Sequence, residues 1–97
     1  MRDNFPFAGI VHPKPYPPVF PPRWNTAGRS SIFAKSVWLT QDSIQTSQLF
    51  VDASMSEMPD VEIVWFDGSF FLDNGHHRAV RYILAGHEYL RCKLLEL

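Results

Sequence analysis

Prolines crowd the first quarter of the chain and restrict what this segment can form. Seven of the eight prolines lie between residues 5 and 24. Because proline lacks a backbone N–H and disrupts both helices and central strands, this segment is expected to be extended or polyproline-like. Aromatic side chains alternate with the prolines, at Phe5, Phe7, Tyr16, Phe20 and Trp24. The sequence therefore predicts an extended N-terminal arm over residues 1–30.

Two interpretations of this arm remain open. A disordered tail would carry fewer aromatic residues, so one interpretation is that the arm lies across the body of the protein and its rings cover an apolar edge. The other is that the arm is a proline-rich ligand for an aromatic groove on a protein partner. The first interpretation makes the arm structural, and the second makes it a docking element.

Apolar patterns predict the elements that follow the arm. Residues 31–39 read as a strand with apolar residues on both faces. Residues 44–53, IQTSQLFVDA, follow a helix-start composition and predict a short helix. Two further strands are predicted at 61–66 and 69–72, and Asp67-Gly68 between them is typical of a hairpin turn.

The last third of the chain predicts one more helix and one more strand. Residues 76–85 have helical spacing, with Ala79, Val80, Ile83 and Leu84 on one arc, and Gly86 is a helix stop. Residues 88–97 alternate as a final strand. Together these elements predict a small α/β (α+β) domain over residues 31–97, with a mixed sheet and two or three short helices.

Composition narrows the classes of function. The chain has 97 residues and a net charge of −1, so it lacks the electrostatic footprint of a non-specific DNA-binding protein. The single cysteine, Cys92, allows no intramolecular disulfide. No apolar run reaches the length of a membrane span. The sequence therefore predicts a soluble, cytoplasmic protein with no membrane contact.

The segment FLDNGHHRAV, residues 71–80, is the strongest candidate site. Unpaired N–H groups at a helix start carry the positive end of the helix dipole and bind anions. Gly75 allows an anion to approach the backbone closely. Arg78 lies opposite the apolar arc, where its guanidinium can form a fork with phosphate oxygens. His76 and His77, neutral at this position, can donate one hydrogen bond or accept a proton.

Other interpretations of this segment stay open. Asp73 or Asn74 can serve simply as a helix cap, and His76 can be a packed, hydrogen-bonded core residue. A metal site is a further alternative. However, neighbouring residues on a helix point roughly 100° apart, so His76 and His77 do not readily hold one ion. The other two histidines add no ligand pattern, and no metal ligand set is predicted.

Residues 61–97 resemble the ParB/sulfiredoxin superfamily. In members of this superfamily, two strands joined by a turn are followed by a Gly-x-His-Arg or Gly-x-Arg-Arg turn, then by a helix that ends at a glycine, and then by a last strand. Here the turn is Gly75-His76-His77-Arg78, the helix ends in Ala85-Gly86, and the last strand is YLRCKLLEL. Before this region, SVWLTQDSIQTSQ resembles the preceding strand and first helix of the family.

The resemblance implies that the turn binds nucleotide phosphates, as it does for ATP in sulfiredoxins and for CTP in ParB partition proteins. Gly75, His76, His77 and Arg78 would form the phosphate cradle. His76 stands where sulfiredoxins place their reactive cysteine, and Cys92 is in the wrong element to replace it, so reductase activity is not expected. Chromosome partition is not expected either, since the DNA-binding domain and dimerisation tail of partition proteins are missing from these 97 residues.

The small members that this chain resembles, the ParB-like nucleases, imply ATP hydrolysis or DNA cleavage as the candidate activity. In that role Arg78 would stabilise charge on the phosphoryl group and His77 would act as acid or base. Asp73 and Asn74 would be supporting residues of the site, and Asp73 would hold a Mg²⁺ ion that bridges phosphates, orient His77, or cap the helix. The first helix would add polar contacts to the nucleotide from Thr46, Ser47 or Gln48.

A second hypothesis assigns the chain to a different class of protein function. It makes the chain a non-catalytic binding or inhibitor protein of the phage or plasmid type. The ParB-like fold would then be a scaffold, and the arm or a local basic face would contact a protein partner.

Overall fold

The computed structural model describes residues 5–10, 12, 14–41 and 60–97. The helix predicted at residues 44–53 lies outside the described residues, as do Thr46, Ser47 and Gln48. None of the helices among the described residues has the length and apolarity needed to cross a membrane.

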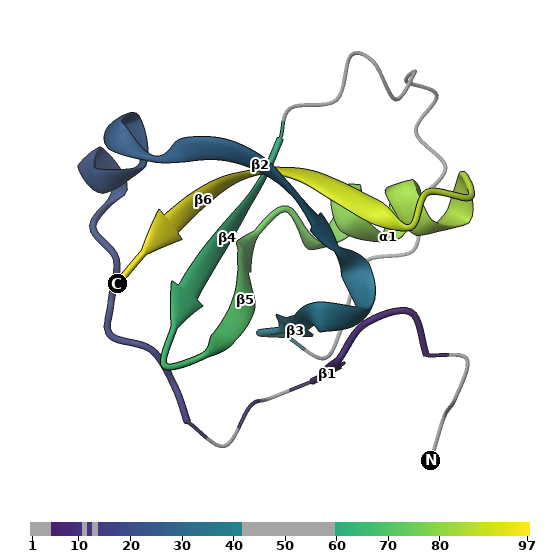
Figure 1. Cartoon of the computed structure of the whole chain (residues 1–97), viewed down its shortest axis with the longest axis horizontal. Coiled ribbons are helices and arrows are strands. Elements are labelled where there is room, and N and C mark those ends of the chain that lie inside the picture. Colours follow the sequence, from purple (N-terminus) through teal and green to yellow (C-terminus); the bar gives the residue numbers. More distant parts are fainter. Residues whose placement is uncertain (1–4, 11, 13, 42–59) are drawn as a thin grey trace.

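A six-stranded mixed sheet forms the body of the protein, in the order β1-β3-β5-β4-β6-β2 (Figure 1). Its strands are β1 (Gly9–Ile10), β2 (Gly28–Phe33), β3 (Val37–Leu39), β4 (Val61–Phe66), β5 (Ser69–Asn74) and β6 (Tyr89–Glu96). The described residues also include one α-helix, α1 (His76–Leu84), and two 3-10 helices, η1 (Pro21–Thr26) and η2 (Ala34–Ser36). The prediction of a small α+β domain with a mixed sheet is confirmed.

The hairpin of β4 and β5 has the predicted turn. Asp67 and Gly68 both have positive φ, 49° and 80°, as a type I′ turn requires at its two central residues. β5 runs two residues beyond the predicted end at Leu72 and stops at Asn74. The chain then continues through α1 to β6, which pairs with β4 in the parallel sense.

The prediction of one strand over residues 31–39 is wrong, because this segment contributes to two separate strands. β2 pairs with β6 at one edge of the sheet, whereas β3 lies between β1 and β5. η2 redirects the chain between them, and its Ala34 is buried, with its N–H donating to the carbonyl of Glu88 at 2.9 Å. Apolar residues occur on both faces of the segment because its two halves pack in different places.

The central strands are buried on both faces of the sheet. In β4, Val61 and Ile63 point to one face, which we call the helix face, and Val64 points to the other, the arm face. β5 follows the same alternation, with Leu72 on the helix face and Phe71 on the arm face. A sheet with two apolar faces requires a cover on each of them.

Helix α1 covers the helix face. Ala79 and Tyr82 of α1 are buried in the core cluster that also holds the helix-face residues of β4 and β5. The predicted apolar arc is wrong at one position, because Leu84 is 66% exposed whereas Tyr82 is only 2% exposed. The buried stripe of α1 is therefore His76, Ala79 and Tyr82, at helical spacing of three residues.

The proline-rich arm is in contact with both faces. Phe7 is buried in the helix-face core, and β1 adds a short parallel strand beside β3. The chain then crosses to the arm face, where Tyr16, Val19 and Trp24 pack against Val64, Phe71 and Leu95. Proline suits this path because an extended strap over a sheet needs no regular backbone hydrogen bonds. The packing therefore supports the interpretation in which the arm lies across the body of the protein and covers an apolar surface.

Replacing Trp24 by alanine is expected to lower the free energy of unfolding by about 3–5 kcal/mol, the usual cost of removing a buried tryptophan from a core. Trp24 is only 7% exposed. Phe20, which is 72% exposed on the same arm, provides the matched control. Phe20→Ala should change stability by less than about 0.5 kcal/mol. Urea denaturation of both variants measures the difference, and equal effects would contradict the role of the arm as a cover.

Candidate functional site

The candidate site is built on the junction of β5 and α1. Gly75 joins them with φ 95°, a left-handed conformation that favours glycine. A Cβ atom at this position would lie 3.0 Å from Cγ1 of Val61 and 3.2 Å from Nε of Arg78. Both the backbone angle and the close packing therefore require glycine at the point where the chain turns from strand to helix.

In the described part of the chain, the start of α1 has no side-chain cap. Gly75 occupies the N-cap position, and the N–H of Ala79 donates to its carbonyl at 2.8 Å. Asn74 does not cap the helix, because its Oδ1 accepts the N–H of Gly75 at 2.9 Å and its amide nitrogen lies 3.4 Å from Oε1 of Glu62. The interpretation in which Asp73 or Asn74 caps the helix is wrong.

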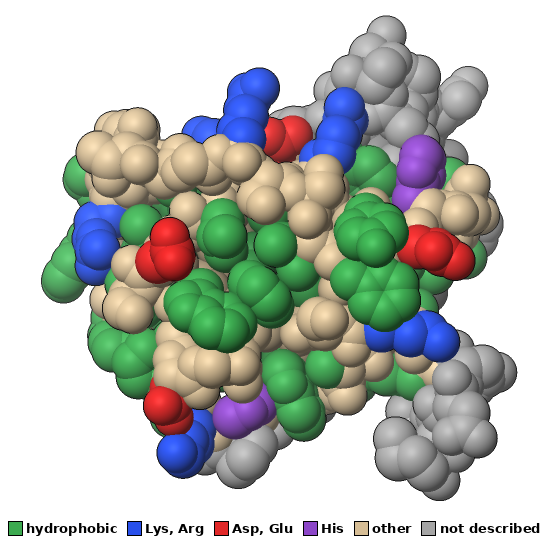
Figure 2. All heavy atoms as spheres, viewed as in Figure 1, with side chains coloured by type: hydrophobic (Ala, Val, Ile, Leu, Met, Phe, Trp, Pro, Cys, Tyr) green, Lys and Arg blue, Asp and Glu red, His purple; other side chains and the backbone are tan. Residues whose placement is uncertain are grey.

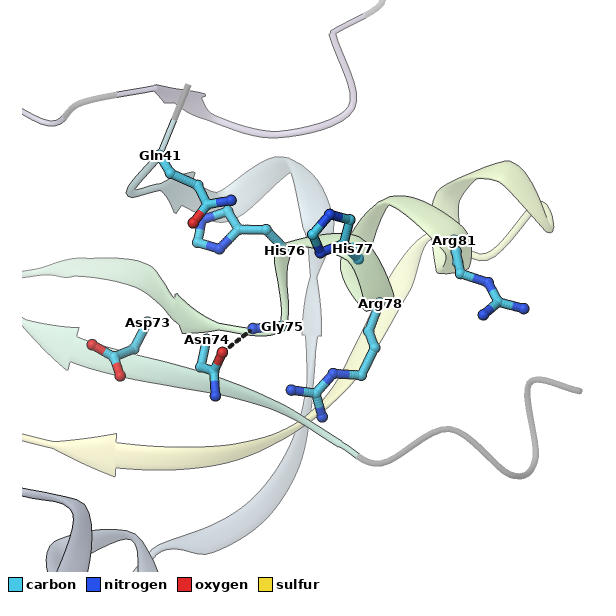
Figure 3. Close-up of a pocket in the computed structure, with 8 residues that line it drawn as sticks. All are labelled: Gln41, Asp73, Asn74, Gly75, His76, His77, Arg78 and Arg81. Carbon is cyan, nitrogen blue, oxygen red and sulfur yellow. Dashed lines mark hydrogen bonds between the residues drawn. The ribbon is translucent and has the colours of Figure 1, made fainter. Parts of the chain in front are cut away.

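Asp73 is held by the arm. Its Oδ1 accepts a hydrogen bond from the hydroxyl of Tyr16, and its carboxylate points away from the helix start (Figure 3). Burial, and then the nearby Asp73 carboxylate, raise the pKa of Tyr16, which keeps its hydroxyl a donor. The arm thus holds this carboxylate on the side away from the start of α1.

His76 is a packed histidine with a hydrogen bond. Its ring is buried, and Nε2 accepts the backbone N–H of Thr40 at 3.1 Å. The Thr40 hydroxyl donates to the carbonyl of Leu72 at 2.7 Å, so the ring ties the end of β3 to the end of β5 and the start of α1. Burial, with a smaller effect from neighbouring His77, lowers the pKa of His76. His76 therefore lines the site as a neutral side chain.

His77 has a polar atom that lacks a partner. Nε2 of its ring is buried and, in the part of the chain that the structure describes, makes no hydrogen bond. A buried polar atom without a partner costs about 1–3 kcal/mol, and such atoms in native proteins call for an explanation such as a ligand, a water molecule or a catalytic role.

Arg78 folds back along the junction. Its Nη1 donates to the carbonyl of Asp60 at 2.9 Å, and the Asp60 carboxylate forms an ion pair with Arg29 at 3.3 Å. Its guanidinium lies on the side of Asn74 and Gly75, whereas Arg81 extends away along the helix (Figure 3). Arg78 is thus held at the helix start by one of its nitrogens, a contact with Asp60 that the sequence did not predict.

These residues line one pocket of about 540 Å³. All six residues from Asp73 to Arg78 contribute to it, together with Gln41 and Arg81. The structure therefore brings every residue of the predicted cradle into the lining of one cavity. Among the described residues, no three His, Cys, Asp or Glu side chains come together as a metal site.

Besides the pocket residues Gln41 and Arg81, three contact partners of the site residues were not predicted from the sequence. Tyr16 restrains Asp73, Thr40 binds His76, and the carbonyl of Asp60 accepts from Arg78. Each comes from a segment distant in sequence, so no local pattern identifies it. Only the aromatic character of the arm at Tyr16 indicated that it would contact the body.

Comparison with known proteins does not identify a family. The sequence matches no protein-family model, and no curated protein matches it significantly.

The stability of the protein is expected to fall as the pH drops below about 6.5, the ordinary pKa of histidine. The folded state holds His76 with a lowered pKa, so the unfolded chain binds more protons in this range and acid favours unfolding. Protonation would also place a proton on Nε2, which accepts from Thr40.

The His76→Gln variant keeps a side-chain acceptor but does not titrate, so its stability should depend less on pH. Urea denaturation at pH 7.5 and pH 5.5 gives the comparison. If the variant loses as much stability as the wild type between these two conditions, His76 is not the responsible group.

Proposed function

We propose that this chain is a ParB-like domain that binds nucleotide phosphates, of ATP or CTP, in the pocket at the start of α1. The observation that carries the proposal is the uncapped helix start, which opens into a pocket lined by Arg78 and Arg81. Free N–H groups and the helix dipole favour an anion at such a position. Arginine adds charge-assisted hydrogen bonds to phosphate oxygens.

The two polar side chains that could have closed this helix start have other partners. Asp73 is bound by Tyr16, and Asn74 accepts the N–H of Gly75. Among the residues that the structure describes, no side chain therefore caps the N–H groups of the first turn. A phosphate group has the charge and the acceptor oxygens that would satisfy them.

The distribution of charge favours a small anionic ligand over a long nucleic-acid duplex. Figure 2 shows Lys and Arg side chains scattered around one face of the molecule, with Asp and Glu among them. The chain has 9 basic and 10 acidic residues, whereas duplex binding relies on a broad basic surface. A local site for the phosphates of a nucleotide, or of one strand end, is the better match.

Within this proposal the cradle residues have different roles. His76 contributes its backbone N–H, because its Nε2 already accepts from Thr40. His77 is the candidate for proton transfer, since its buried Nε2 has no partner among the described residues. Asp73 lines the pocket, but Tyr16 holds its carboxylate on the side away from the helix start. This carboxylate would therefore have to release Tyr16 before it holds a Mg²⁺ ion that accompanies the nucleotide; such ions use one or two carboxylates plus phosphate oxygens.

The alternative function, a non-catalytic protein that docks a partner through its arm, has less support. Tyr16, Val19 and Trp24 are occupied in packing against the sheet of the same chain. A segment that covers its own core cannot leave to bind an aromatic groove without exposing Phe71 and Leu95 to water.

Nucleotide binding should depend on the guanidinium of Arg78. We expect wild-type protein to show a thermal shift with ATP or CTP in the presence of Mg²⁺, since a ligand that binds only the folded state stabilises it. Arg78→Gln should weaken binding roughly tenfold or more, as the loss of a charge-assisted hydrogen bond predicts. Isothermal titration calorimetry of both proteins measures the affinity.

Arg23→Gln is the matched control, because Arg23 lies in η1 and does not line the pocket. It should bind as the wild type does. Since Arg78 also contacts Asp60, the melting temperature of Arg78→Gln without ligand must be measured as well. Absence of a shift with every nucleotide, or equal binding by a folded Arg78→Gln variant, would contradict the proposal.

Hydrolysis, if the site is catalytic, should require His77. We expect His77→Gln to bind nucleotide within a few fold of the wild type but to lose at least a hundredfold in phosphate release, the contribution typical of a general acid or base. A phosphate-release assay at saturating nucleotide separates this outcome from weaker binding. Equal turnover by the variant would assign the proton transfer to another group, and no turnover by the wild type would mark the domain as a binding module.

A further inference from the structure

The two edges of the sheet differ in how far they can pair with another strand. At one edge, β1 has only two residues, and Pro6 and Pro13 lie on either side of it in the sequence. At the other edge, β2 has six residues without proline, and it pairs only with β6 among the described strands. Long, regular edge strands offer a row of unpaired backbone groups, and natural proteins usually protect them.

The register of β2 on β6 identifies which backbone groups point outward. Ala34 donates its N–H to the carbonyl of Glu88, one step beyond the Phe33–Tyr89 pair. Hydrogen-bonded pairs alternate along an antiparallel ladder, so Ile32, Ser30 and Gly28 face β6. Arg29, Ser31 and Phe33 therefore direct their N–H and C=O groups away from the sheet.

These three residues are exposed, and their side chains share one face by strand alternation. We propose that β2 pairs with β2 of a second copy of this chain, antiparallel and centred on Ser31, which joins two sheets into one. In this register Ser31 lies opposite Ser31 of the second copy, and Arg29 lies opposite Phe33 of that copy. All three outward-facing residues then find hydrogen-bonding partners across a two-fold axis.

Side-chain chemistry favours this register. Phe33 is 38% exposed and packs on Tyr89, 55% exposed, with ring centroids 5.4 Å apart. The pairing places Arg29 of the second copy beside this aromatic pair, where a guanidinium interacts favourably with a ring. Small serine side chains at the centre allow the two strands to approach. In its ion pair with Asp60, Arg29 keeps 82% of its side chain exposed, so most of this side chain is accessible to a second copy.

Cysteine cross-linking tests both the partner and the register. Two Ser31→Cys chains would face each other across the two-fold axis, with Cα atoms about 5.5 Å apart, within the range that a disulfide spans. Under mild oxidation this variant should form a covalent dimer in high yield. Arg29→Cys is the register control, since the two introduced cysteines would lie roughly 13 Å apart and should cross-link at least tenfold less. Cys92 is buried, and burial raises its pKa to about 11, so it should not react.

A second experiment tests the same pairing without an introduced cysteine. Because the N–H of Ser31 points away from β6, Ser31→Pro should leave the fold intact while removing an intermolecular hydrogen bond. Sedimentation velocity should show a concentration-dependent dimer for wild type and for Ser31→Ala, and a monomer for Ser31→Pro, with circular dichroism confirming that all three are folded. A wild-type monomer at every concentration, equal cross-linking at positions 29 and 31, or a dimer that survives Ser31→Pro would overturn the proposal.

Discussion

Burial of the sheet on both faces is the constraint on which the rest of the structure depends. β4 contributes Val61 and Ile63 to one face and Val64 to the other, and all three side chains are inaccessible to water. A chain of 97 residues has little material with which to cover two apolar faces. Helix α1 and Phe7 of the arm cover one face, and Trp24 and its neighbours in the arm cover the other, so the arm is part of the core rather than an appendage.

The position of the arm also determines which group binds Asp73, just before the helix start. Because Tyr16 packs beside Phe71 on the arm face, its hydroxyl reaches Asp73 at the end of β5. That contact occupies the carboxylate that precedes α1 in the sequence, and no side chain among the described residues caps the first turn. The cover of the arm face and the restraint of Asp73 are therefore consequences of one packing arrangement.

The two histidines of the turn show how one helical step changes the role of a side chain. His76 lies on the buried stripe with Ala79 and Tyr82 and binds Thr40, which fixes the ends of β3 and β5 to the helix. His77 is turned by about 100° and its Nε2 finds no partner among the described residues. The first is thus a structural residue whose ring is neutral, and the second is the histidine to which a reaction at this site would be assigned.

The sequence by itself determined the local elements whose signals are short in range. The alternation of VEIVWF, the Asp67-Gly68 turn, the helix after Gly75 and the final strand all follow from contacts between near neighbours, and each is present. The grouping of Asp73 to Arg78 in one pocket also follows from adjacency in the chain. Periodicity and turn chemistry are sufficient for these features because they depend on backbone geometry alone.

Only the tertiary structure decided the features that join distant segments. Residues 31–39 resemble one strand, yet they divide between an edge strand and an inner strand, because β6 and β5 offer separate places to pair. The sequence of the arm does not indicate which face of the sheet the arm covers. It also does not indicate that Tyr16 binds Asp73, or that Arg78 binds the carbonyl of Asp60. These contacts span 57 and 18 residues, and local propensity carries no information at that range, since packing of the whole chain selects the partners.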